Sequence, residues 1–201
     1  MFDAYLRELK DRILWRTARR AGRWVPPNVV TLAAFLIGLM AAGAAWGRAY
    51  GAGLGLWLLN RLLDGLDGTI ARSTDRQTAF GGFLDLTLDF VVYAAVPIGL
   101  ALGAGSRAAL LTVIGLLASF YVNATWMYLA AILERRRLAI PGGEQTSAAM
   151  PEGIIAGTET AVLYAIFFLW PRALVPVGAA MAVLVGATAA QRLRWTWRHL
   201  P

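Results

Sequence analysis

The chain has 201 residues, of which 58% are hydrophobic and 15% charged, whereas a soluble domain of this size carries about a quarter charged residues. The apolar surplus argues against a protein surrounded by water and indicates one that faces bilayer lipid. The lack of cysteine excludes a disulfide framework and a thiolate site, and a single histidine, His199, argues strongly against a histidine-based hydrolase or zinc centre.

Residues 1–24 differ from everything that follows. Between positions 2 and 20, leucine and isoleucine side chains such as Leu6, Leu9 and Ile13 fall near one side of a helix, and the basic residues lie mostly elsewhere. This pattern predicts an amphipathic helix on an anionic membrane surface. It is not typical of a signal peptide, because no apolar core follows a short basic start.

Apolar runs of about 20 residues predict six membrane-spanning helices. They cover residues 29–46, 53–70, 80–102, 110–132, 153–169 and 173–190. The expected fold is therefore an all-α membrane protein in which six transmembrane helices, forming one domain over residues 25–201, follow an N-terminal amphipathic helix.

The net charge of +7 is distributed unevenly along this topology. All of the 19 basic residues except Arg48, Arg107 and Arg172 fall on one side of the predicted membrane, so both termini are expected to be cytoplasmic. The basic excess thus reflects topology, and nucleic acid is not an expected partner. Lys10 is the single lysine, and such a preference for arginine is typical of GC-rich prokaryotic genomes, which predicts a prokaryotic inner membrane.

Four of the 12 acidic residues lie in the second and third spans or at their cytoplasmic ends: Asp64, Asp67, Asp85 and Asp89. A carboxylate in a membrane is costly and by default marks a functional site. Spacings of three and four residues place each pair on one helix face, and a short turn brings both faces to the same depth. Four ionised carboxylates there would repel by on the order of several kcal/mol. Either some are protonated or, as we prefer, two divalent ions (Mg²⁺ or Mn²⁺) neutralise them.

The segment between the two acidic pairs predicts a cradle for a pyrophosphate. Gly68 directly follows Asp67 and removes a side chain where a ligand approaches the metals. Arg72, one turn further on, can contact phosphate oxygens through two parallel hydrogen bonds. Thr78 either caps the third span or contacts a phosphate or sugar. For single residues, simpler roles in helix packing and anchoring stay open.

At these positions the chain resembles the CDP-alcohol phosphotransferase family, whose pattern is D-x2-D-G-x2-A-R-x8-G-x3-D-x3-D. Every specified residue is present with its spacing: Asp64, Asp67, Gly68, Ala71, Arg72, Gly81, Asp85 and Asp89. Six spans and a leading amphipathic helix are also similar to the family, so the resemblance covers most of the chain.

The resemblance implies that the four aspartates bind two metal ions and that Asp89 also acts as general base. It implies CDP contacts from Gly68, Ala71, Arg72, Thr78 and Gly81. Asn28 and Thr31, which open the first span, resemble the family's nucleotide-side segment, although an ordinary helix start explains them equally well. The implied reaction transfers a substituted phosphate from a CDP-linked lipid, such as CDP-diacylglycerol, to an alcohol with release of CMP. A homodimer with its site at the cytoplasmic end of the bundle is expected.

The acceptor alcohol is less clearly marked. Phe90 follows Asp89, where family members that use inositol phosphate usually carry arginine. The proline and lysine typical of phosphatidylglycerophosphate synthases are also absent, whereas Pro97 is similar to phosphatidylserine synthases. We therefore expect an acceptor without a phosphate, with glycerol phosphate and inositol phosphate as alternatives.

Two polar residues of later spans are candidate acceptor contacts. Asn123 lies in the fourth predicted span and Glu159 in the fifth, where an interhelical hydrogen bond is an equally good interpretation of the glutamate. Two other classes of protein remain as alternatives. An ion or proton transporter would need a polar path across the bilayer, and a non-catalytic scaffold would be marked by a broken motif.

Overall fold

The computed structural model describes residues 15, 18–20, 22, 24–135 and 157–200. Its elements are α2 (Pro27–Trp46), α3 (Tyr50–Ser73), α4 (Ala79–Ala104), α5 (Arg107–Asn123), α6 (Trp126–Arg135), α7 (Gly157–Leu169), the 3-10 turn η1 (Pro171–Ala173) and α8 (Leu174–His199). Within these residues every regular element is helical, which confirms the all-α prediction. The predicted amphipathic helix lies almost wholly outside the described residues.

Among the described residues, four helical segments are long and apolar enough to cross a membrane. They are Pro27–Trp46, Ala79–Ala104, Arg107–Arg135 and Pro171–His199, in keeping with a multi-pass membrane protein. The predicted total of six is not confirmed. Helix α3 carries charged residues within its apolar run, and the 13 residues of α7 extend only about 20 Å, against a hydrocarbon core of about 30 Å.

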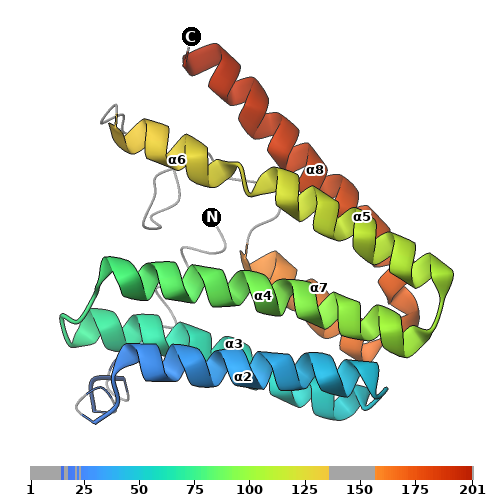
Figure 1. Cartoon of the computed structure of the whole chain (residues 1–201), viewed down its shortest axis with the longest axis horizontal. Helices are drawn as coiled ribbons and strands as arrows, with labels where there is room; N and C mark the ends of the chain where they lie inside the picture. The colour runs from blue at the N-terminus through green and yellow to red at the C-terminus, as the bar shows by residue number, and fades with distance from the viewer. Residues whose placement is uncertain (1–14, 16–17, 21, 23, 136–156, 201) are drawn as a thin grey trace.

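The fourth predicted span is not one continuous helix. Helix α5 ends at Asn123 and α6 begins at Trp126, and Figure 1 shows the ribbon leaving its helical path between them. At this break the Thr125 hydroxyl donates to the carbonyl oxygen of Val122 over 2.8 Å. Such side-chain bonds compete with helical backbone pairing, whereas a hydropathy average over 20 residues does not register them.

The helices form two groups joined by a common core. Helix α2 packs on both α3 and α4, and α5 packs along α8 (Figure 1). Helix α7 lies against α3 and α4, and its aromatic side chains belong to one core cluster with buried residues of α5 and α8. The largest fully buried side chains, Trp57, Tyr164 and Phe167, lie in this shared core.

Helices α2 and α4 are fixed at the end of the bundle away from the α3–α4 turn. At Gly99 and Gly103 of α4, an added Cβ would overlap carbonyl oxygens of α2, so glycine permits this close approach. Arg48, just after α2, donates through Nε to the carbonyl oxygen of Gly103 over 2.5 Å. The acidic residues lie toward the opposite end.

Candidate active site

The turn between α3 and α4 sets the register of the two acidic pairs. Helix α3 ends at Ser73, and Thr78 caps the start of α4 by accepting a hydrogen bond from the backbone nitrogen of Gly81 over 2.9 Å. One of the two interpretations of Thr78, the helix cap, is therefore present in the structure.

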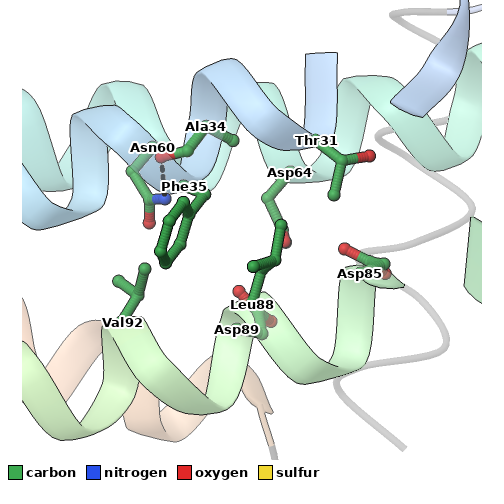
Figure 2. A pocket seen from close by; sticks show the side chains of 9 residues that line it. All are labelled: Thr31, Ala34, Phe35, Asn60, Asp64, Asp85, Leu88, Asp89 and Val92. Carbon is green, nitrogen blue, oxygen red and sulfur yellow. Dashed lines mark hydrogen bonds between the residues drawn. The ribbon is translucent and has the colours of Figure 1, made fainter. Parts of the chain in front are cut away.

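Three of the four aspartates surround one small cavity between α2, α3 and α4. Figure 2 shows Asp64 reaching from α3, and Asp85 and Asp89 from α4, toward this space. Its volume of about 10 Å³ suits a single water molecule or ion. The remaining lining residues are Thr31, Ala34, Phe35, Asn60, Leu88 and Val92.

The fourth aspartate, Asp67, is buried and bound from α2. It is 4% exposed, and its Oδ2 accepts a hydrogen bond from the Thr31 hydroxyl over 2.6 Å. The segment that opens the first span is thus connected directly to the acidic motif. The structure gives Thr31 a contact with a motif aspartate that the sequence did not predict.

Asp89 is paired with an arginine to which the sequence assigned only a topological role. Nη2 of Arg61 lies 2.6 Å from Oδ1 of Asp89, and Nη1 lies 3.4 Å from Oδ2. Nη1 also lies 3.7 Å from Oδ2 of Asp64. A sequence signal was present, because Arg61 precedes Asp64 by one helical turn and so shares its face.

The carboxylates have the chemistry expected for a divalent ion but are not drawn together into a chelating group. Within the described part of the chain, no three acidic, histidine or cysteine side chains are grouped so as to hold a metal. Asp67 is engaged by Thr31, and Asp89 by Arg61. The all-oxygen donor set around one cavity nevertheless suits Mg²⁺ or Mn²⁺.

The residues predicted to contact CDP lie in two groups. An added Cβ at Gly81 would lie 3.0 Å from Oγ1 of Thr78 and 3.1 Å from Oδ1 of Asn28, so these three residues converge. A Cβ at Gly68 would lie 3.2 Å from Nη1 of Arg72. Both glycines thus keep open the space beside a polar side chain. Ala71 lies half-buried on α3.

A family model described as CDP-alcohol phosphatidyltransferase matches residues 24–191. The chain belongs to the CDP-alcohol phosphatidyltransferase family. It is accordingly an enzyme of phospholipid biosynthesis that transfers substituted phosphate groups.

Two relatives of this transferase cover much of its length. The inner membrane protein YnjF of Escherichia coli is 38% identical over 147 residues, which are 73% of this chain and 71% of YnjF. The archaetidylinositol phosphate synthase of Methanothermobacter thermautotrophicus is 32% identical over 202 residues, covering 99% and 94% of the two chains.

A solved structure has a similar fold. The Mycobacterium tuberculosis phosphatidylinositol phosphate synthase (PgsA1) with CDP-DAG bound matches the transferase with a TM-score of 0.71 and 26% identity over 92% of this chain and 94% of that one. Another structure of the same synthase, in complex with manganese and citrate, matches with a TM-score of 0.70 and 24% identity, over 93% and 88%.

The two candidate acceptor residues of the transferase do not line the acidic cavity. Asn123 ends α5, where its Oδ1 accepts a hydrogen bond from Nη1 of Arg192 on α8 over 2.9 Å. Arg192 is 7% exposed, which makes it a buried cation that the sequence interpretation had counted only for topology. Glu159 lies half-buried in the first turn of α7.

Proposed function

We propose that this transferase moves the phosphatidyl group of a CDP-linked lipid to inositol phosphate and releases CMP. The observation that carries the proposal is the cavity lined by Asp64, Asp85 and Asp89, with the Asn28–Thr78–Gly81 group one helical turn away along α2 and α4. In this proposal the carboxylates would hold the metal ions and the Asn28–Thr78–Gly81 group would contact the CDP part of the donor.

The choice of acceptor reverses the sequence-based preference for an alcohol without a phosphate. Both named synthases among the relatives make inositol phosphate lipids. The preference came from Phe90, which stands in place of the expected arginine. The choice of inositol phosphate therefore rests on these two relatives, because Asn123 and its partner Arg192 do not line the acidic cavity.

The family resemblance implies two divalent ions, Mg²⁺ or Mn²⁺, which the four aspartates would hold. Bound there, the ions would supply charge stabilisation for the pyrophosphate and the departing CMP. Manganese is present in a structure of the mycobacterial synthase. Asp67 is kept in place by Thr31, and the Arg72 guanidinium beside Gly68 contacts phosphate oxygens.

Asp89 acts as general base in this mechanism. It removes the proton from the acceptor hydroxyl as that oxygen bonds to the lipid-side phosphorus, while the bond from phosphorus to the CMP oxygen breaks. The proton then resides on Asp89, and the electron pair of the broken bond leaves with CMP.

For the membrane arrangement we propose six spans, in which α3 and α7 add to the four helical segments that are long and apolar enough to cross a membrane. Of the charged residues of α3, Arg61 pairs with Asp89 on α4 and Asp67 accepts a hydrogen bond from Thr31 on α2, so these charges face other helices. We further propose cytoplasmic termini and active site, from the basic residues, and a homodimer, from the family resemblance. The relative YnjF is an inner membrane protein.

The test is a turnover assay of purified enzyme with Mn²⁺ or Mg²⁺, CDP-diacylglycerol and a panel of inositol phosphate, inositol, serine and glycerol phosphate. CMP release and a new lipid are expected with inositol phosphate. Turnover with serine or glycerol phosphate alone would refute the acceptor, and no turnover with any alcohol would refute the reaction.

A further inference from the structure

The guanidinium of Arg61 is bound on all sides. Nε donates to Oδ1 of Asn60 over 2.8 Å, Nη1 donates to the Tyr93 hydroxyl oxygen over 2.8 Å, and Nη2 reaches Asp89. Its central carbon lies 4.7 Å from the Trp57 ring centroid and 4.8 Å from that of Tyr93, within the range of cation–π attraction. All three nitrogens and the guanidinium plane therefore have fixed partners.

These partners are themselves held by neighbouring helices. Asn60 donates to the carbonyl oxygen of Ala34 on α2 over 2.7 Å, which Figure 2 draws as a dashed line. Trp57 donates to the carbonyl oxygen of Ala161 on α7 over 3.0 Å. The Tyr164 hydroxyl, also from α7, donates to the carbonyl oxygen of Tyr93 over 2.7 Å.

A purely topological role does not explain this arrangement. An arginine that only anchors a helix end extends its charged group into water or among lipid headgroups. The Arg61 side chain is instead 13% exposed and is aimed at Asp89. Both carboxylate oxygens of Asp89 lie within 3.4 Å of Arg61 nitrogens, and Oδ2 of Asp64 lies 3.7 Å from Nη1 of Arg61.

We propose that Arg61 is a positioning residue with two effects of opposite sign, an inference that rests on the proposed function. Its directional bonds orient the Asp89 carboxylate for proton removal, which favours turnover. Its fixed positive charge, set among the carboxylates, weakens their binding of a divalent ion. Arg61 thus sets the metal affinity of the site as well as the geometry of the base.

Two substitutions separate geometry from charge. Arg61→Gln removes both, so kcat should fall about a hundredfold, as misplacing a reacting group does, with the KM for CDP-diacylglycerol unchanged. Mn²⁺ should bind about tenfold more tightly, because a positive charge next to the carboxylates is gone. Arg61→Lys keeps the charge without the planar fork. Its kcat should fall similarly, while its Mn²⁺ affinity stays close to wild type.

The metal affinity is measured without substrate, by isothermal titration of Mn²⁺ into purified enzyme and by the electron paramagnetic resonance of free Mn²⁺. Arg107→Gln is the matched control, because it makes the same chemical change at an exposed residue that begins α5. It should leave both kcat and Mn²⁺ affinity unchanged. Each variant is first checked by size exclusion in detergent.

A milder variant keeps the test decisive if Arg61→Gln does not fold. Tyr93→Phe removes one hydrogen bond to Arg61 and keeps the ring, so kcat should fall about fivefold with Mn²⁺ affinity unchanged. A role limited to holding helices together predicts weaker Mn²⁺ binding in Arg61→Gln. That result, or wild-type kcat in Arg61→Gln or in Tyr93→Phe, overturns the inference. If the proposed function itself is wrong, the wild-type enzyme will neither bind Mn²⁺ nor release CMP. This outcome is distinct from those that overturn the inference on Arg61.

Discussion

The hydrogen bond from Thr31 to Asp67 offers a sharp test of how the acidic cluster is stabilised. Thr31→Val keeps the shape of the side chain but removes the donor, so the buried Asp67 carboxylate loses its partner on α2. A hydrogen bond to a charged group contributes about 1.5–3 kcal/mol. At about 2–4 °C per kcal/mol for a chain of this size, the variant should melt about 3–12 °C lower in EDTA.

Saturating Mn²⁺ should reduce this deficit to less than half, because a bound cation then partners Asp67 in place of the hydroxyl. The assay is thermal unfolding in detergent with EDTA and with Mn²⁺. Thr188→Val is the matched control, since Thr188 is fully buried and donates to the carbonyl oxygen of Leu184 in its own helix. Its deficit should be equal in both conditions. An equal deficit for Thr31→Val in both conditions would refute the reasoning.

Asp89→Asn should reduce CMP release at least a hundredfold while the protein stays monodisperse, and retained activity would contradict its role as base. Gly81→Ala should raise the KM for CDP-diacylglycerol about tenfold, because the added methyl group meets Thr78 and Asn28. The control Gly82→Ala should leave this KM unchanged, because its methyl group meets nothing within 4 Å. Equal effects of the two variants would contradict a CDP contact at the Asn28–Thr78–Gly81 group. Chelation by EDTA should abolish CMP release, and added Mg²⁺ or Mn²⁺ should restore it. Unchanged turnover in EDTA would contradict the metal requirement.

The sequence predicted the helical class and the convergence of four aspartates, of which the structure brings three around one cavity and pairs the fourth, Asp67, with Thr31. Spacings of three and four residues fix the faces of α3 and α4, and a short turn fixes their relative depth. It did not predict the pairing of Arg192 with Asn123, because these residues are 69 positions apart and meet only when α8 packs on α5. The break after Asn123 was missed for a different reason: hydropathy is averaged over about 20 residues, whereas the bond from the Thr125 hydroxyl to the carbonyl oxygen of Val122 is local.

Arg61 was misread because the positive-inside rule counts a basic residue by the side of the membrane on which it falls, and not by the helix face from which it projects. The acidic cluster keeps an excess of negative charge when Arg61 is included. One guanidinium paired with Asp89 partly offsets the charge of four aspartates, and the Thr31 hydroxyl adds a dipole but no charge. Asp64 and Asp85 still face the same cavity. Unless some of these carboxyls are protonated, the excess of negative charge persists, and divalent ions remain the partners that would balance it.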